Sequence, residues 1–196
     1  MSKLPPTHQR ILEAARELFT LHGYHGTSTR KLAALVGISE GAIFRHFASK
    51  RDILLALLQP NISQNLSAAG LYQPDDSPRK VLGQFIRMRA EQFSRIFPLL
   101  KIVLLESAVE PELKQAWLKQ VLLQAREELS TCFAYWQESG EIRQDLTPEA
   151  LSRLFMTQLF GSLFLNQVSE GQFFAPQTLE AQLELSLELF LNSVTL

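Results

Sequence analysis

The sequence predicts an all-α protein in two parts, a basic head over residues 1–58 and an acidic body over residues 59–196. Three observations support this prediction. Apolar residues recur at helical spacing along most of the chain. No segment bounded by turn signals alternates apolar and polar residues with the period of a strand. Glycine and capping residues divide the head into short segments, whereas the segments of the body are long.

Charge separates the two parts more clearly than the overall net charge of −1 suggests. The head contains eight Lys or Arg against four acidic residues, a net charge of +4, and it also contains all four histidines. The body contains 11 basic and 16 acidic residues, a net charge of −5. We therefore expect the head, and not the body, to bind a polyanion.

Several function classes are disfavoured by features that the sequence lacks. Apolar runs are far shorter than the roughly 20 residues that a membrane span needs. The amino terminus has no apolar stretch of a signal peptide, so we expect a cytoplasmic protein without a membrane partner. The motifs of serine hydrolases, dinucleotide-binding proteins, P-loop proteins and zinc proteases are missing. We therefore expect neither an enzyme nor a cofactor.

The cysteine and the histidines also lack the spacing of a metal site. Cys132 is the single cysteine and lies in an apolar-rich stretch, so we expect it to be a small core residue. His22 and His25 have i, i+3 spacing at a predicted helix end, but no carboxylate or cysteine is near them in the sequence. No metal ligand is therefore predicted.

The predicted helices follow from apolar periodicity, capping residues and glycine or proline positions. In the head we expect a helix ending at Gly23, one capped within residues 27–29 and running through Val36, one from Ser39 to about Phe47, and one from Ser49 into the sixties. In the body we expect helices from Pro78 to about Ile96, a short one from Pro98, one from Pro111 to Ser139, one from Pro148 to about Ser169, and a last one that includes Leu179 and Val194. The hinge between the two parts is placed near Gly70 to Ser77.

The head contains the spacing of a helix-turn-helix motif. Ala33, Gly37 and Ile43 follow the pattern Ala-x3-Gly-x5-Ile. A small residue at Ala33 lets two helices approach closely, and Gly37 permits a left-handed turn. The second helix would then enter the major groove with its first turn leading. The spacing by itself also suits any two packed helices.

The stretch from Ile11 to Leu54 resembles the DNA-binding domain of the TetR family, the tetracycline-repressor type of bacterial transcriptional regulators. Its first helix and turn run from Ile11 to Thr27, and the similarity continues in register through Gly37, Phe47 and Lys50. The resemblance implies a homodimer that reads two half-sites of a palindromic operator on double-stranded DNA. It also implies an amino-terminal three-helix DNA-binding domain and a carboxyl-terminal helical domain for ligand binding and dimerisation. Repression is the usual mode of action in this family.

Phosphate contacts are expected at two helix starts. The resemblance implies that Lys50 contacts phosphate, adding its charge to the amides of the fourth helix. Thr27, Ser28 and Thr29 could bind phosphate at the second helix, and this role is compatible with capping. The resemblance also places His46 toward phosphate, although packing beside Phe47 is the alternative. Phe44 departs from the tyrosine common in the family, so it can only pack against a sugar or a thymine methyl.

Base contacts are assigned to the first turn of the recognition helix and to two arginines. The residues are Ser39, Glu40, Gly41, Ala42, Arg45 and Arg30. Ala42 is suited to a thymine methyl and the arginines to guanine. For each residue a phosphate contact or a solvated side chain remains the alternative.

The resemblance implies a pocket for a small effector in the body, and aromatic residues are available to line it. An apolar or aromatic effector, of cationic or lipophilic character, suits such walls. The alternative for each candidate is a place in the core. The candidates are Phe85, Met88, Arg89, Phe93, Leu105, Trp117, Val121, Phe133, Trp136, Phe155 and Gln158.

The last two helices are expected to form the dimer. The final helix has two apolar faces, one containing Leu187 and one containing Leu185 and Leu189, and two faces need two partners. One partner would be the body's own core and the other a second copy, giving a four-helix bundle with the helix at residues 148–169. Effector binding would then pull on the fourth helix and change the roughly 34 Å spacing of the recognition helices. The interface candidates are Leu154, Gly161, Ser162, Leu165, Leu183, Leu187, Phe190 and Val194.

A different type of regulator is the main alternative to this interpretation. It would use the same helix-turn-helix but answer to a protein partner, or to no effector at all. An enzyme is a weaker competitor, because no catalytic motif was found.

Overall fold

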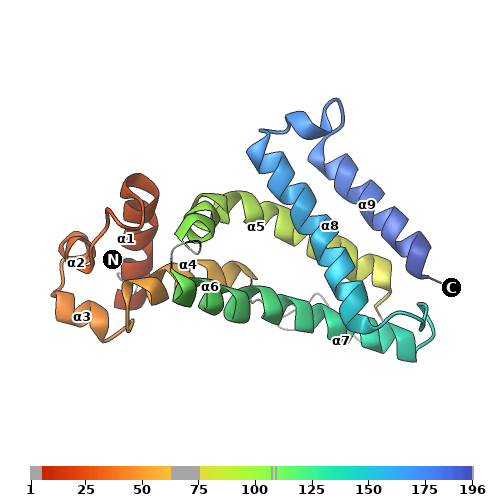
Figure 1. Ribbon diagram of the computed structural model, residues 1–196, viewed down its shortest axis with the longest axis horizontal. Helices are drawn as coiled ribbons and strands as arrows, with labels where there is room; N and C mark the ends of the chain where they lie inside the picture. The colour runs from red at the N-terminus through yellow and green to blue at the C-terminus, as the bar shows by residue number, and fades with distance from the viewer. Residues whose placement is uncertain (1–5, 63–75, 107, 109, 196) are drawn as a thin grey trace, which may run out of the picture. The chain divides into compact units, whose positions relative to one another are not determined.

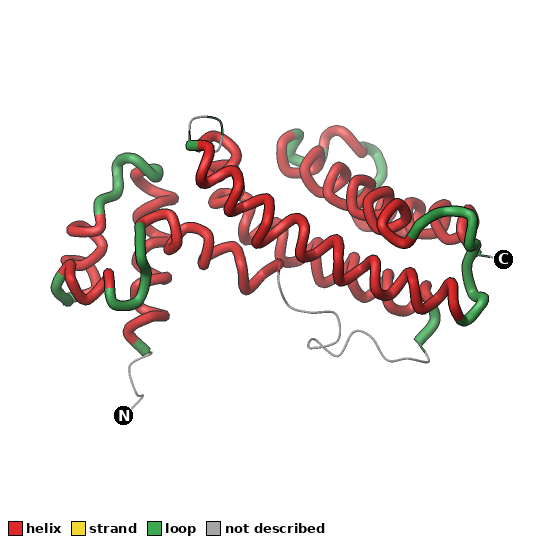
Figure 2. Tube along the Cα trace, turned by 60° about the horizontal axis from the view of Figure 1, so that its bottom comes forward, coloured by secondary structure: helices red, strands yellow, loops and turns green. Residues whose placement is uncertain are grey.

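The computed structural model describes residues 6–62, 76–106, 108 and 110–195. Every regular element in these residues is a helix or a helical turn (Figures 1 and 2), apart from an isolated β-bridge between Ile142 and Thr195. This confirms the all-α prediction. Within the described part of the chain, no helix has both the length and the hydropathy of a membrane span.

The chain packs as two compact units. The first unit combines Met1–Ile62 with Ile96–Val121, and the second combines Ser63–Arg95 with Leu122–Leu196. Packing therefore groups a segment of the body with the head. The division after residue 58 expected from the sequence stays a prediction about function. The expected hinge falls almost entirely outside the described residues.

The helices of the head are α1 (Thr7–His22), α2 (Thr29–Val36), α3 (Glu40–Phe44) and α4 (Lys50–Ile62). The hydroxyls of Ser28 and Ser39 accept hydrogen bonds from backbone amides at the starts of α2 and α3, as their capping positions predict. The helix α3 is shorter than expected. Its last turn tightens because the amides of His46 and Phe47 both donate to the Ile43 carbonyl, at 2.9 and 3.0 Å.

The core of the head is formed where α2 and α4 pack on α1 and where α3 packs on α2. The apolar side chains that fill it are fully buried: Ile11, Phe19, Leu32, Ile43, Ile53 and Leu54. Tyr24, in the turn after α1, adds its ring to that of Phe19, with ring centroids 5.6 Å apart. These contacts give four short helices the shared core that none of them has separately.

The helix α5 runs unbroken over Pro78–Glu106 and includes Pro98, so the predicted end near Ile96 was wrong. Proline removes one backbone hydrogen bond and disfavours the helix around it. Here the cost is offset because apolar side chains on both sides of Pro98 are buried, namely Ile96, Phe97, Leu99 and Leu100. Burial of these side chains keeps the backbone on its helical path.

The single long helix predicted from Pro111 is divided into three consecutive parts. They are α6 (Pro111–Trp117), a π-helical segment (Leu118–Leu123) and α7 (Gln124–Glu138). A π segment inserts an extra residue into the helical turn, which local periodicity does not reveal. The predicted end near Ser139 is confirmed, since Gly140 follows with a φ of 77°.

The second unit contains α7, α8 (Pro148–Val168), α9 (Leu179–Val194) and the first part of α5, with a short 3-10 turn (Gln172–Phe174) between α8 and α9. Thr147 and Thr178 cap α8 and α9 through their hydroxyls. In Figure 1, α8 and α9 run side by side in opposite directions, and the contacts between them agree.

Aromatic rings make up much of the core of the second unit. The ring of Phe133 lies 5.5 Å from Trp136, 6.4 Å from Phe155 and 5.9 Å from Phe190, measured between centroids. Edge-on and tilted contacts of this kind are the favoured geometries of aromatic pairs. Cys132, which precedes Phe133 in the sequence, is buried as predicted. Burial raises the pKa of its thiol to about 11.

Candidate nucleic-acid interface and effector region

The helix-turn-helix has the geometry that its spacing predicts. Ala33 is buried at the contact of α2 with α3, and Ile43 is fully buried. Gly37 has a φ of 74° and a ψ of 37°, the left-handed conformation that only glycine adopts without strain. The next amide, that of Ile38, donates to the Ala33 carbonyl at 3.0 Å. The turn therefore fixes the direction in which α3 leaves α2.

The first turn of α3 presents polar and small residues to solvent. Ser39, Glu40 and Gly41 are exposed, and so are the side chains of Phe44 and Arg45 beyond them. The Glu40 carboxylate accepts a hydrogen bond from the Thr29 hydroxyl, which holds it beside the start of α2. This face can supply acceptors, a cation and an aromatic ring to a groove.

Two of the predicted DNA contacts are buried inside the head. Ala42 is 8% exposed, so its methyl group belongs to the core and does not fit the expected thymine contact. Thr27 is fully buried, and its hydroxyl lies 3.0 Å from the Leu18 carbonyl and 2.9 Å from the Gly23 carbonyl. Its role here is to close the α1–α2 turn, because the hydroxyl is already used there.

The remaining candidates near α2 are accessible. Ser28 is exposed although its hydroxyl accepts the Lys31 amide, and Arg30 is exposed on the first turn of the helix. His46 is exposed as well, with its ring 6.3 Å from that of His8. The ring stacked on Phe47 is that of His8, at 4.7 Å, which does not favour packing of His46 there, and the phosphate contact of His46 stays a prediction.

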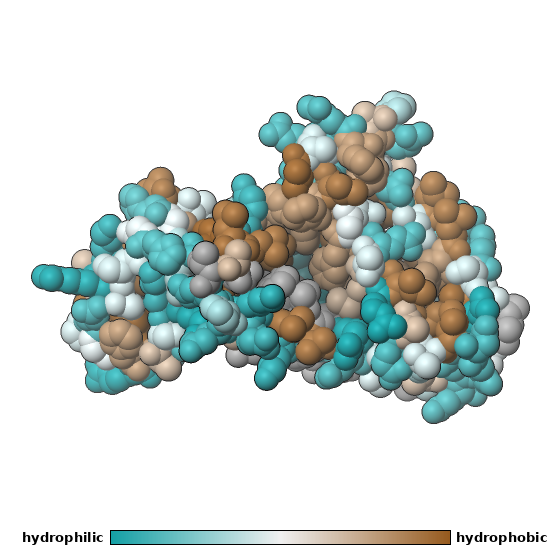
Figure 3. Space-filling view, viewed as in Figure 1, coloured by the Kyte–Doolittle hydropathy of each residue, from teal (hydrophilic) through white to brown (hydrophobic). Residues whose placement is uncertain are grey.

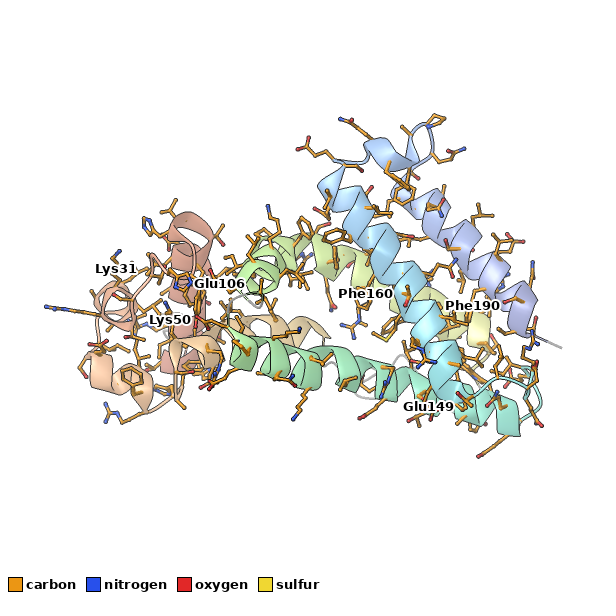
Figure 4. All side chains as sticks on the ribbon, viewed as in Figure 1. Lys31, Lys50, Glu106, Glu149, Phe160 and Phe190 are labelled. Carbon is orange, nitrogen blue, oxygen red and sulfur yellow. The ribbon has the colours of Figure 1, made fainter. Side chains whose placement is uncertain are left out.

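The Lys50 side chain is turned toward the α1–α2 turn (Figure 4). Its ammonium donates to the carbonyls of Tyr24 and Thr27 at 2.8 and 3.0 Å and lies 4.0 Å from the Tyr24 ring centroid. Burial lowers its pKa, while the carboxylates of Glu110 and Glu106 oppose that shift. An ammonium has three donors, so one is left for a phosphate. Sequence reasoning did not reveal this structural role of Lys50.

The effector candidates are split between the two units. The second unit holds Phe85, Arg89, Phe93, Phe133, Trp136 and Phe155, all buried, and Met88 and Gln158, half-buried. Leu105 belongs to the first unit and is 73% exposed. The side chains of Trp117 and Val121 lie outside the described residues. Beside Phe155 the described side chains leave a void of about 10 Å³, so they pack closely there.

Arg89 is a buried cation in this aromatic surrounding. It is 3% exposed, its guanidinium lies 4.9 Å from the Phe85 ring centroid, and it donates to the Gln92 side chain at 3.1 Å. Burial lowers its pKa to about 10, and the charge of Glu128 opposes the shift. A cation held against an aromatic ring away from water can bind the polar end of a mostly apolar molecule.

The dimer candidates also fall into two groups. Leu154 and Leu165 are 56% and 39% exposed on α8, and an added Cβ at Gly161 would meet no atom within 4 Å. Four candidates on α9 are buried within a single chain, which does not fit their assignment to the dimer interface: Leu183, Leu187, Phe190 and Val194. Ser162 is also buried, at 9% exposure.

The second apolar face of α9 does reach solvent. Leu185 and Leu189 are 50% and 58% exposed, and Figure 3 shows apolar residues gathered over α8 and α9. A groove of about 500 Å³ follows these two helices and includes Leu154 and Leu189. A second groove, of about 540 Å³, lies between α5 and α9 beside Gly83 and Leu187. The sequence analysis did not find these grooves.

Comparison with known proteins is consistent with this geometry. Residues 11–57 match the family of bacterial regulatory proteins of the tetR type. The HTH-type transcriptional regulator UidR of Escherichia coli K12 is 27% identical over 161 residues, 81% of this chain and 80% of UidR. The HTH-type transcriptional repressor AcnR of Corynebacterium diphtheriae is 43% identical over 63 residues, 32% of this chain and 33% of AcnR.

A solved structure shares the fold over most of the chain. FadR of Bacillus subtilis, a transcriptional regulator determined in complex with stearoyl-CoA, superposes with a TM-score of 0.74 at 21% identity. The match covers 93% of this chain and 97% of FadR. Together the motif and the fold define a helix-turn-helix DNA-binding protein. Residues 11–57 therefore form a DNA-binding domain of the tetR type, and most of the chain is similar to bacterial transcriptional regulators.

Proposed function

We propose that the protein is an effector-responsive repressor that binds a palindromic operator as a homodimer in the cytoplasm. The observation that supports this most directly is the exposed first turn of α3, set by the left-handed Gly37 and the Ser39 cap. Ser39, Glu40 and Gly41 would enter the major groove, with Arg45 and Phe44 beside them. Thr29 orients the Glu40 carboxylate, which is suited to accept a cytosine amino group.

Phosphate contacts would flank this reading head. The amides at the start of α2 and the exposed Ser28 and Arg30 can bind one phosphate group. Lys50 would use its third donor for another, while keeping its bonds to Tyr24 and Thr27. These phosphate contacts position the head on DNA of any sequence, whereas α3 discriminates between sequences.

The homodimer would form through the exposed faces of α8 and α9. Leu154, Leu165, Leu185 and Leu189 are all exposed there, and the groove between the helices offers a concave surface for the second copy. Burying such residues in a four-helix bundle would remove an apolar surface from water. The buried leucines of α9 would support this face from within.

The effector would be small and largely apolar, and it would bind among the aromatic side chains of the second unit. FadR was determined with stearoyl-CoA, a long apolar chain with a polar end. Phe85 and Phe93, with Arg89 between them on α5, offer a comparable combination of apolar walls and one buried cation. Because α5 continues to Glu106, a shift at Phe93 would be transmitted along one helix to residues that pack with the head.

Selection of bound duplexes from a random library tests the proposal without knowledge of the genome. The purified protein should enrich a palindrome of two half-sites, and Arg45→Ala should alter the preference at one or two positions. An apolar ligand found by thermal-shift screening should then release the selected duplex. Failure to enrich any sequence at low salt would contradict sequence-specific binding. Enrichment without release by any ligand would favour control by a protein partner.

The dimer is tested by Leu189→Glu, which places a charge on the exposed face of α9. Sedimentation should show monomers, and affinity for the selected palindrome should fall at least about tenfold because two half-sites are no longer linked. Leu21→Glu is the matched control, since Leu21 is 70% exposed on α1. A variant that stays dimeric would place the interface elsewhere.

A further inference from the structure

Three metal-ligating side chains converge in the first packing unit. The His25 Nε2 atom lies 2.6 Å from a carboxylate oxygen of Glu106. Together with a carboxylate oxygen of Glu110, their ligand atoms all lie within 4.8 Å of one another. Across the described ranges, no other set of three or more His, Cys, Asp or Glu side chains converges in this way.

The fold brings these residues together from distant parts of the sequence. His25 lies in the turn between α1 and α2, Glu106 is the last residue of α5, and Glu110 immediately precedes α6. The two glutamates are held in register because the Glu110 amide donates to the Glu106 carbonyl at 2.8 Å. Sequence analysis predicted no metal ligand at His25, since both carboxylates are remote in the chain.

The surroundings of the three ligands favour a cation. The pKa of the neighbouring Tyr24 is raised to about 12 by burial and then by the negative charge of Glu110, with Glu106 also contributing. Lys50 and Arg51 supply positive charges nearby, but the Lys50 ammonium is bound to two backbone carbonyls and the Arg51 guanidinium is paired with Glu112. The side chain of His25 is 68% exposed and that of Glu106 is 15% exposed, so the cluster is open to solvent on the histidine side.

We propose that His25, Glu106 and Glu110 form a binding site for a divalent transition-metal cation, with Zn²⁺ as its best representative. One imidazole nitrogen and two carboxylate oxygens are ligands that Zn²⁺ accepts, whereas Ca²⁺ and Mg²⁺ prefer oxygen only. Three protein ligands leave a fourth position for water. A bound metal would take the place of the direct contact between His25 Nε2 and the Glu106 carboxylate.

A bound cation would join the α1–α2 turn to the α5–α6 connection. His25 is followed closely by Ser28, the cap of α2, so the ion would stiffen the entry to the helix-turn-helix. The site thus adds a second input, independent of the aromatic interior of the second unit. Metal binding can be measured without DNA, so its outcome does not depend on the proposed operator contacts.

The test is titration of the tag-free, full-length protein with Co²⁺, followed by visible d–d absorption, and with Zn²⁺ in competition with a chromophoric indicator. One equivalent per chain is expected. His25→Ala and Glu106→Gln should each weaken Zn²⁺ binding at least about tenfold. His22→Ala and Glu112→Gln are the matched controls, since they alter exposed residues of the same types in the same unit.

Melting temperatures and circular dichroism complete the test. Zn²⁺ should raise the melting temperature of the wild type and of both controls, but not that of Glu106→Gln, which keeps the size and shape of the side chain. Circular dichroism checks that each variant is folded, and Glu110→Gln replaces any that is not. The proposal is overturned if the wild type binds no equivalent, or if folded His25→Ala and Glu106→Gln bind as tightly as the controls do.

Discussion

The head and the second packing unit are both helical, but different interactions hold them. In the head, hydroxyls and ammonium groups bind the backbone: Ser28 and Ser39 cap helices, Thr27 closes a turn, and Lys50 bridges two carbonyls. In the second unit, the rings of Trp136, Phe155 and Phe190 pack around that of Phe133. The geometry of the head is thus specified by individual hydrogen bonds, whereas the interior of the second unit is specified mainly by the packing of apolar side chains.

The largest effect is expected from Phe133→Ala. Phe133 is fully buried and contacts Trp136, Phe155 and Phe190. Its removal should lower the free energy of unfolding by about 3–5 kcal/mol. Urea denaturation followed by tryptophan fluorescence measures this, with Phe173→Ala as control because Phe173 is 61% exposed. Equal losses in the two variants would contradict the aromatic core described above.

Gly37→Val tests the turn of the head. Valine at a φ of 74° should cost about 1–2 kcal/mol of unfolding free energy, since left-handed backbone strains residues with a Cβ. Binding to the selected duplex should weaken as well. Gly41→Ala is the control for stability, because Gly41 is helical and has open space around it, so it should gain about 0.5–1 kcal/mol. A neutral Gly37→Val would show that the turn does not need glycine.

Thr27→Val removes one buried hydroxyl while preserving shape. The carbonyls of Leu18 and Gly23 lose their partner, and the free energy of unfolding should fall by about 1 kcal/mol. Thr131→Val is the control on α7, where an exposed hydroxyl donates to the Glu127 carbonyl. If Thr27→Val and Thr131→Val lower the free energy of unfolding equally, buried hydroxyl bonds do not hold the head as described.

Lys50→Ala is expected to have a diagnostic effect on DNA binding, in addition to loosening the α1–α2 turn through loss of its bonds to the Tyr24 and Thr27 carbonyls. Affinity should fall alike on specific and random duplexes, and the slope of log K against log salt should drop by about 1. Fluorescence anisotropy at several salt concentrations measures the slope. An unchanged slope with lower stability would assign Lys50 to the α1–α2 turn only.

The features that the sequence predicts well are local. Ser28, Ser39 and Gly37 act on backbone groups within a few residues, so their roles can be read from spacing. The helix end predicted before Pro98 was wrong because the effect of this proline depends on burial of the residues around it, which is a property of the whole fold. The π segment at Leu118–Leu123 has no local signal for the same reason.

Contacts between distant segments account for the rest. The apolar stripe of α9 predicts that Leu183 and Leu187 are covered, but not whether the chain itself or a second copy covers them, and the chain itself buries them. Thr27 and Ala42 have the residue types of DNA contacts, yet their positions are inside the head. His25 shows the opposite case, since its carboxylate neighbours are supplied by Glu106 and Glu110 from the far end of α5 and beyond.

The buried thiol of Cys132 has a practical consequence for spectroscopy. It is the single cysteine of the chain, and burial raises its pKa to about 11, so very little reactive thiolate is present near neutral pH. A cysteine introduced at an exposed position such as Arg30 could therefore be labelled selectively in the native protein. Two such labels in a dimer would allow the separation of the reading heads to be followed by pulsed electron spin resonance, without first removing the natural thiol.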